Sequence, residues 1–355
     1  MSIKQIHYNL DTIESLGATF NLIVGEKSNG KSYQVKHKRA IENYLKTGNR
    51  FILLRRWRED LTNLWIEQYF ADVDVEKLTN NKYQTITVYR KVIYFANVSE
   101  DGKIKRGEKI GYVMALSTEQ HYSGGSFLDV TDIIFEEFME RGTYLKDECS
   151  KLEYLYSTID RKRGTTRVWM VGNSVSKVNP YIQGWALDPI LKTIKQGEIK
   201  TKEIKKEFNT FTIAIEFCKA SGGKSMSIAN NMIDSGAWIV NKQPKIDVKE
   251  YKSQFIFGFQ YKDFKFLCQV MTKKEKANDF IFFIQPYVKD FKKNLIIFTD
   301  IINPSIYYQR DIYNSTFPNQ KLNELFKEFK ESKIFYCDDI TGTDFKQCID
   351  FIIKR

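Results

Sequence analysis

Short apolar runs and longer amphipathic stretches alternate along the first part of the chain. The apolar runs predict strands at Asn21–Val24, Arg50–Arg56, Ile133–Phe135, Val168–Val171 and Phe211–Phe217. Between them, the patterns predict a helix at Ser32–Lys46, closed by Gly48, and another at Tyr144–Arg163. Strands that alternate with helices are typical of an α/β fold.

Other stretches of this half have patterns of their own. Gln84–Val98 and Lys109–Leu116 predict a β insertion around a turn at Glu100–Gly102. Ser117–Ser126 is polar and contains glycine, so we expect a mobile loop at a strand end. The basic run Lys192–Lys206 predicts a lid or a surface helix, whose lysines either contact nucleic acid or are solvated.

The second half repeats the mixture of strands and helices. Strands are predicted at Gln254–Gln260, Phe264–Met271, Phe280–Ile284 and Leu295–Phe298, and helices at Leu322–Phe329 and around Phe345–Ile352. In both helices apolar residues recur at i, i+3, i+4 and i+7. We expect two domains, 1–217 and 248–355, joined by a linker over 218–247. SGGKS at Ser221–Ser225 belongs to this linker, because Cys218 stands where a phosphate loop has its first glycine.

Composition narrows the class of protein. The chain has 355 residues, 42% of them hydrophobic, which is enough for large cores. It contains no run of about 18 apolar residues, and its N-terminus lacks the apolar segment of a signal peptide. We therefore expect an intracellular soluble protein without a membrane partner. The five cysteines are scattered without CxxC pairs and the three histidines are dispersed, so neither a disulfide framework nor a zinc site is predicted.

The charge adds a hypothesis about partners. The formal net charge is +11, which favours a polyanionic partner, because neutralised phosphates release counterions. The alternative is a generally lysine-rich composition, as the abundance of Lys, Asn, Ile, Phe and Tyr also suggests.

A phosphate-binding loop is the strongest chemical signal. The spacing GxxxxGKS follows an apolar strand and precedes a well-capped helix, which disfavours a simple glycine turn on the surface. The predicted nucleotide-binding residues are Gly25, Glu26, Lys27, Ser28, Asn29, Gly30, Lys31, Ser32 and Tyr33. Lys31 would reach the β- and γ-phosphates of ATP and Ser32 would ligate Mg²⁺. Upstream, Tyr8 either stacks on the adenine or packs the edge of the domain.

Two carboxylates end the next informative strand. Glu136 and Glu137 follow the apolar segment Ile133–Phe135. At such a position the first acid holds Mg²⁺ and the second is the catalytic base that polarises the attacking water. The first acid is more usually Asp, so Glu136 leaves the metal geometry open, and a solvated Glu-Glu pair is the alternative.

A third polar strand end and a basic cluster complete the candidates. Asn173 ends the strand Val168–Val171 at the position of a sensor for the γ-phosphate. Arg161 and Arg163 precede that strand, where an arginine of a ring ATPase can reach the nucleotide of the neighbouring subunit. A plain basic loop is the competing interpretation.

The order of these motifs resembles one family, the DNA encapsidation (genome-packaging) ATPases of small short-tailed phages. The resemblance rests on IVGEKSNGKSY at 23–33, FILLRRWRE at 51–59, IIFEEF at 133–138 and GNSVSKVNPY at 172–181, and covers about residues 15–185. It implies a P-loop NTPase domain of the additional-strand, catalytic-glutamate type. The family's Asp-Glu pair is Glu-Glu here, and the loop Glu119–Gly125 has no lysine for a trans-acting role.

Carried over position by position, the resemblance assigns roles to these residues. Lys31 and Ser32 bind phosphate and Mg²⁺, Glu136 is the Mg²⁺ acid and Glu137 the catalytic glutamate. Asn173 becomes the sensor that couples hydrolysis to movement, and Arg161 is preferred to Arg163 as the trans-acting finger.

The resemblance also implies partners. They are double-stranded DNA, further copies of the chain in a ring, expected to be a pentamer, the phage portal or connector, and a structural RNA as a further possibility. Candidate DNA contacts are Arg58, Arg141 and Lys146, any of which is equally compatible with a solvated side chain. The expected location is the host cell cytoplasm, and transiently the portal vertex of the procapsid.

The strand pattern of the second half resembles a ribonuclease-H-like domain. A two-metal nuclease needs clustered carboxylates, one of them in the first strand. That strand reads FIFGFQ and has no acid, although Asp300, Asp338 and Asp339 remain available. We therefore expect a nuclease-inactive domain. The alternatives are a terminase large subunit with a working nuclease and a P-loop switch that binds nucleotide without mechanical work.

Overall fold

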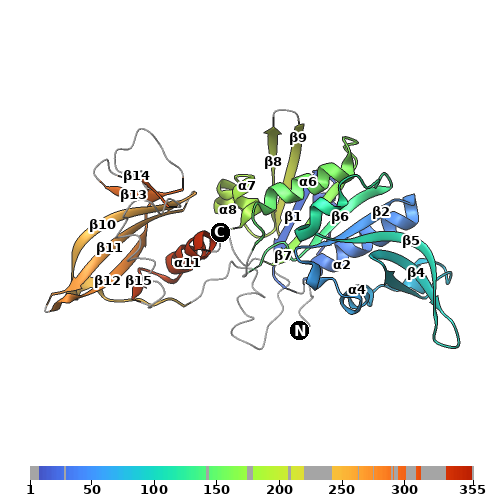
Figure 1. Ribbon diagram of the computed structural model, residues 1–355, viewed down its shortest axis with the longest axis horizontal. Coiled ribbons are helices and arrows are strands. Elements are labelled where there is room, and N and C mark those ends of the chain that lie inside the picture. Colours follow the sequence, from blue (N-terminus) through green and yellow to red (C-terminus); the bar gives the residue numbers. More distant parts are fainter. Residues whose placement is uncertain are drawn as a thin grey trace. The chain divides into compact units, whose positions relative to one another are not determined.

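The computed structural model describes residues 8–27, 29–140, 144–173, 179–206, 209–219, 242–262, 264–274, 276–288, 291, 295–300, 309–312 and 333–353. The chain forms two compact units, Met1–Ile239 and Val240–Arg355 (Figure 1). Their division falls inside the expected linker 218–247, whose residues 220–241 lie outside the described part of the chain. The finer domain boundaries stay a prediction.

In its described residues, the first unit has one sheet of nine strands in the order β3-β4-β5-β2-β6-β7-β1-β9-β8. The strands are β1 Phe20–Gly25, β2 Arg50–Arg55, β3 Thr85–Tyr89, β4 Val92–Val98, β5 Ile104–Ala115, β6 Val130–Glu136, β7 Arg167–Asn173, β8 Glu198–Lys206 and β9 Asn209–Phe217. Strands β5, β2, β6, β7, β1 and β9 are parallel. Strands β3, β4 and β8 run antiparallel to the strand beside them.

Helices lie on both faces of this sheet (Figure 1). They are α1 Asp11–Glu14, α2 Lys31–Val35, α3 Asn43–Thr47, α4 Asn63–Phe70, α5 Val75–Leu78, α6 Glu148–Asp160, α7 Pro180–Gly184 and α8 Asp188–Thr193. A π-helical segment, Lys36–Glu42, joins α2 to α3, and 3-10 turns occupy Arg58–Asp60 and Leu116–Tyr122. The predicted helix over Ser32–Lys46 is confirmed as this continuous α2, π and α3 run.

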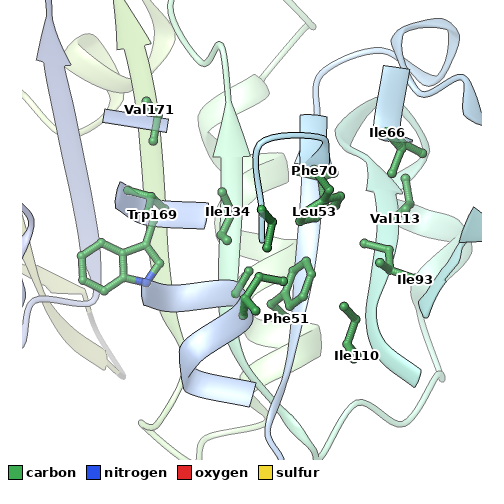
Figure 2. Close-up of a cluster of buried hydrophobic side chains, with 14 of the residues drawn as sticks. Phe51, Leu53, Ile66, Phe70, Ile93, Ile110, Val113, Ile134, Trp169 and Val171 are labelled. Atoms are coloured by element: carbon green, nitrogen blue, oxygen red, sulfur yellow. The ribbon is translucent and has the colours of Figure 1, made fainter. Parts of the chain in front are cut away.

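The core follows from the alternation of side chains along the strands. In β1, Leu22 packs with α6, α7 and α8, whereas Ile23 packs on the opposite face with α2 and α4. Figure 2 shows part of the hydrophobic cluster on the face of Ile23, which includes Phe51 and Trp169 from the sheet and Phe70 of α4. Both faces of the central strands are buried, as is typical of a parallel sheet between helices.

The expected elements of this unit are largely confirmed. The strands predicted in its parallel core all form, and the β insertion is the antiparallel part β3-β4-β5. Its turn closes with the amide of Ser99 donating to the carbonyl of Lys103 at 2.9 Å. A second turn, at Arg90 and Lys91, has positive φ at both residues and separates β3 from β4. The helix expected over Tyr144–Arg163 is shorter, Glu148–Asp160.

Two local predictions need correction. The segment Ser117–Ser126 does follow a strand end, but its first part belongs to a 3-10 turn, Leu116–Tyr122, in which Leu116 is buried and the buried Glu119 pairs with Lys151 at 2.7 Å. Within Lys192–Lys206, residues from Glu198 onward form strand β8 instead of a lid or surface helix. Pairing with β9 decides this conformation, and Ile199 and Ile204 pack on opposite faces of the sheet. Tertiary contacts therefore outweigh the helix propensity of the lysines.

The second unit has a six-stranded sheet in its described residues, ordered β14-β13-β10-β11-β12-β15. The elements are β10 Tyr251–Tyr261, β11 Phe264–Lys273, β12 Lys276–Pro286, β13 Ile296–Thr299, β14 Gln309–Asp311, β15 Ile334–Tyr336, α11 Asp339–Ile353 and a 3-10 turn at Val248–Glu250. Strands β10, β11 and β12 form an antiparallel meander, β13 is parallel to β10, and β14 is parallel to β13. The four predicted strands and the last helix are confirmed, and the helix expected at Leu322–Phe329 lies outside the described residues.

Candidate nucleotide-binding site

Three strand ends meet at one edge of the first sheet. Strands β1 and β7 are parallel neighbours, with Gly25 in register with Asn173. Strand β6 lies beside β7, with Glu136 in register with Val171. Because parallel strands end at the same edge, the sheet brings the phosphate loop, the acidic pair and the predicted sensor together.

The phosphate loop has the backbone that its glycines were expected to allow. Gly30 has φ of +94°, a left-handed conformation that side chains disfavour, and α2 begins at the next residue. A Cβ on Gly25 would lie 2.8 Å from the Cβ of Cys218, which follows β9. Gly25 therefore allows a close approach to Cys218, and Gly30 allows the turn after which the first amides of α2 can face a phosphate. Ser28 lies outside the described residues.

The loop lysine is held by its own loop. Lys31 Nζ donates to Asn29 Oδ1 at 3.0 Å and to the carbonyl of Glu26. Burial lowers the pKa of the Lys31 ammonium, and nearby carboxylates, including Glu137, oppose this shift. Lys31 is thus a buried cation at the loop, in reach of the acidic strand end.

Glu136 is joined directly to the phosphate loop. Its Oε2 accepts a hydrogen bond from Ser32 Oγ at 2.9 Å, and its Oε1 accepts one from the hydroxyl of Tyr69 at 2.7 Å. Burial raises the pKa of Glu136, although both hydrogen bonds act in the opposite direction. A hydroxyl and a carboxylate so close together are oxygen donors of the kind that Mg²⁺ prefers. The longer Glu therefore fits the place where Asp is more usual.

Tyr69, in α4, is a site residue that the sequence analysis missed. Tyr69 belongs to no motif. Its helix lies between β2 and β3 in the chain, far in sequence from Glu136 and Glu137. Its only signal is an aromatic residue on a helix, which more often indicates core packing.

Glu137 occupies the turn that follows β6. Its φ is +56°, a left-handed conformation that is uncommon for a residue with a side chain. The amide of the next residue, Phe138, donates to the carbonyl of Val171 in β7 at 3.2 Å. Glu136 and Glu137 therefore have different backbone conformations, and only Glu136 is hydrogen bonded to Ser32.

Tyr8 lies against the phosphate loop. Its amide donates to the carbonyl of Asn29 at 3.0 Å, and its hydroxyl donates to Glu216 Oε2 at 2.7 Å. The side chain is 8% exposed, so it packs the edge of the domain in this structure. Its stacking on adenine stays a prediction.

The predicted arginine finger lies at the other edge of the sheet. Arg161 and Arg163 are in the turn before β7, whose far end carries Asn173. A strand of this length spans roughly 20 Å, so neither arginine meets the loop of its own chain. Arg163 donates to several backbone carbonyls, including that of Val130 at 3.0 Å. Arg161 is exposed and donates to the carbonyl of Gly125 at 2.6 Å.

The candidate DNA contacts are placed only in part. Arg58 lies in the 3-10 turn after β2 and Lys146 precedes α6, and both are exposed. Arg141 lies outside the described residues. Within the part of the chain that is described, no helix is long and apolar enough to span a membrane.

The comparison with family models decides which family these features belong to. The family of the Podovirus DNA encapsidation protein (Gp16) matches residues 2–340. The chain belongs to this family. The resemblance inferred from the motifs is therefore confirmed, and it extends well beyond residues 15–185.

Individual relatives agree with the family. The DNA packaging protein of Bacillus phage phi29 is 26% identical over 283 residues, which cover 74% of each chain. That of Bacillus phage B103 is 27% identical over 263 residues, covering 72% of this chain and 75% of the relative. A chain of the solved bacteriophage Phi-29 genome packaging motor assembly has a TM-score of 0.54 at 21% identity, covering 98% of this chain and 99% of its own. This structural likeness shows a shared α/β fold.

Proposed function

We propose that this chain is the ATPase of a phage genome-packaging motor, which moves double-stranded DNA into a procapsid as a subunit of a homomeric ring. The observation that carries the proposal is the hydrogen bond between Ser32 of the phosphate loop and Glu136 at the end of β6. It joins the two motifs that ATP hydrolysis requires, within a chain of the DNA encapsidation family. The relatives' packaging role supports the assignment.

The side chains at this edge of the first sheet would each have a different role in ATP hydrolysis. The amides of the loop and Lys31 would bind the β- and γ-phosphates, exchanging the present bonds of Lys31 for phosphate oxygens. Mg²⁺, entering with the nucleotide and held by Ser32 and Glu136, would neutralise phosphate charge. Glu137 would accept a proton from the attacking water, and Asn173 would contact the γ-phosphate.

The strand order supports the additional-strand, catalytic-glutamate type of P-loop NTPase. Strand β7 lies between β1, which leads into the loop, and β6, which carries the acids. Asn173 ends this intervening strand, beside the strand that leads into the phosphate loop, which supports its proposed role as a sensor.

Arg161 would act in trans. Its distance from its own loop and its exposure favour a role at the nucleotide of a neighbouring subunit. Arg161 has one hydrogen bond to a backbone carbonyl of its own chain, whereas the less exposed Arg163 has several. Hydrolysis at subunit interfaces would then require a ring, for which we expect five subunits. A portal or connector and a structural RNA are further proposed partners, at the portal vertex in the host cytoplasm.

The second unit would be a ribonuclease-H-like domain without nuclease activity. Its meander, followed by β13 and β14 added on the β10 side, supports this fold. Asp300 at the end of β13 pairs with Lys262 at 3.0 Å, and Asp339 pairs with Lys245 at 3.1 Å. Among the described residues no three acidic, His or Cys side chains gather to hold a metal ion. These carboxylates are therefore poor candidates for a two-metal centre.

The test is steady-state ATPase activity of the full chain in Mg²⁺ buffer, with and without double-stranded DNA, across a salt series. DNA should stimulate hydrolysis, and the stimulation should fade as salt rises, because phosphate contacts release counterions. A gel of the same DNA should show it intact.

The other outcomes select the rival functions. Stimulation with cut DNA would indicate a terminase with an active nuclease. Nucleotide binding without any stimulation, even with procapsids present, would indicate a P-loop switch and contradict the proposal.

A further inference from the structure

Arg56 directly follows β2, and its side chain is buried at 1% exposure. Its Nε donates to Glu148 Oε2 at 2.8 Å, and its Nη2 donates to the carbonyl of Phe138 at 2.7 Å. Its Nη1 lies 3.0 Å from Glu140 Oε2 and 3.5 Å from the carbonyl of Glu137. One guanidinium therefore binds both the turn that contains Glu137 and the N-terminus of α6.

The partner of Arg56 is itself fully engaged. Glu148, the first residue of α6, is 0% exposed and accepts hydrogen bonds from the amide of Leu145 at 2.7 Å and from the hydroxyl of Tyr181 at 2.6 Å. The ring of Tyr144 lies 4.6 Å from the Arg56 guanidinium. A buried ion pair with its hydrogen bonds satisfied holds a defined geometry, and geometry is what it contributes most reliably.

That geometry acts on a strained backbone. Glu137 has a φ of +56°, which persists only where the surroundings hold it. The amide of Phe138 is held by the carbonyl of Val171, and the carbonyl of Phe138 is held by Arg56. Phe138, the residue after Glu137, is thus held at both its amide and its carbonyl, and the direction of the Glu137 side chain depends on the backbone fixed there.

We infer that Arg56 is a positioning residue for Glu137, which fixes the turn after β6 and ties it to the N-terminus of α6. The inference rests on the proposed role of Glu137 as catalytic base. It gives Arg56 a task distinct from nucleotide binding, because the guanidinium binds the backbone beyond Glu137 instead of the phosphate loop.

The first test is Arg56→Lys in the full chain. Lysine keeps the positive charge beside Glu148, but it lacks the planar fork that reaches a carboxylate and a carbonyl together. The kcat of ATP hydrolysis should fall at least tenfold, with KM within threefold and the melting temperature nearly unchanged. Arg50→Lys is the matched control, because Arg50 begins β2, at the opposite end of that strand from Arg56, and pairs with Asp129; this variant should keep kcat within twofold.

A second variant removes the charges together. Arg56→Met combined with Glu148→Gln removes both charges of the buried ion pair, so the variant should fold. The new side-chain oxygen can accept from the amide of Leu145 while its NH2 donates to the hydroxyl oxygen of Tyr181, and Glu140, which loses its partner, is partly exposed. It should bind a fluorescent ATP analogue with an affinity within threefold of the parent and show the same loss of kcat. Circular dichroism and melting confirm the fold of both variants.

The outcomes separate the inference from the proposed function. A kcat within threefold of the parent in either folded variant overturns the positioning role, as does a loss of nucleotide affinity that accounts for the whole effect. Glu137→Gln is measured in parallel. Near-normal turnover of that variant overturns the role of Glu137 and the inference with it, whereas an inactive Glu137→Gln beside a normal Arg56→Lys overturns the inference alone.

Discussion

Both units place a carboxylate at the end of a parallel strand, but the groups that bind the two carboxylates differ. Glu136, at the end of β6, accepts hydrogen bonds from the neutral hydroxyls of Ser32 and Tyr69. Asp300, directly after β13, accepts a hydrogen bond from the amide of Lys262 at 2.9 Å and pairs with the ammonium of the same residue. The first carboxylate is bound by neutral groups, with Arg55 near enough to act against the rise that burial causes in its pKa, whereas the second forms an ion pair with an ammonium.

The pKa shifts of buried carboxylates also differ between the two units. Burial raises the pKa of Glu136, so its charge is held against a desolvation cost, as is frequent at functional sites. Burial also raises the pKa of Asp338 in the second unit, but hydrogen bonds led by the amide of Thr341 outweigh it and hold that pKa below its ordinary value. The buried carboxylate beside the phosphate loop therefore has a raised pKa, whereas the carboxylate before α11 has a lowered one.

The largest expected effect tests the proposed cation that a neighbouring subunit contributes to the Glu136 end of the sheet. Arg161→Ala should lower ATP turnover by about 10³- to 10⁵-fold, because the proposed finger stabilises charge in the transition state. Mixing this variant with Glu137→Gln subunits should restore part of the activity, since each subunit supplies what the other lacks. The measurement is ATPase rate against mixing ratio, and an absence of rescue at every ratio would count against a finger acting in trans.

The second effect compares the two units directly. Glu137→Gln should bind ATP but lower kcat by about 10²- to 10⁴-fold, as expected for the loss of a general base. Asp300→Asn is the matched change in the second unit and should leave ATPase activity within about twofold. Equal losses in the two variants, or near-normal turnover of Glu137→Gln, would break the comparison.

The third effect concerns the neutral donors of Glu136. Tyr69→Phe removes one hydrogen bond to Glu136, the proposed Mg²⁺ acid, so half-maximal activation should need about tenfold more Mg²⁺. Tyr44→Phe is the control, because Tyr44 also donates to a glutamate, Glu108, at 3.1 Å, but in the β insertion. A Mg²⁺ dependence of Tyr69→Phe equal to that of Tyr44→Phe would show that Tyr69 is only a packing residue.

The smallest effect tests the structural carboxylate. Asp338→Asn should lower the free energy of unfolding by about 0.5 kcal/mol at pH 7, because Asn can still accept from the amide of Thr341 but lacks the negative charge beside the N-terminus of α11. Because the folded-state pKa of Asp338 is lowered, its contribution is present above the unfolded-state pKa and is lost as pH falls through the folded-state pKa. Denaturant unfolding of parent and variant should converge in acid, and an undiminished difference there would contradict the electrostatic explanation.

Much of the fold was predictable because it depends on local signals. The central strands of the first unit are apolar on both faces, so their runs stand out, and the meander of the second unit has similar runs. Strand β8 was missed because its lysines favour a helix locally, and only pairing with β9 makes the segment extended. The 3-10 turn after β5 was missed because the partner that anchors Glu119, Lys151, lies in a distant helix.

The sequence by itself determined the phosphate loop, the acidic pair, the terminal Asn173 and the family, because each is a short motif at a strand end whose chemistry needs those residues in that spacing. The tertiary structure alone decided that Tyr69 bonds Glu136, that Arg56 bonds the turn of Glu137, and that Arg163 binds several backbone carbonyls of its own chain whereas the exposed Arg161 binds one. These contacts join residues far apart in the chain, and a pairing of that kind leaves no local pattern, since it exists only once the sheet has brought the strand ends together.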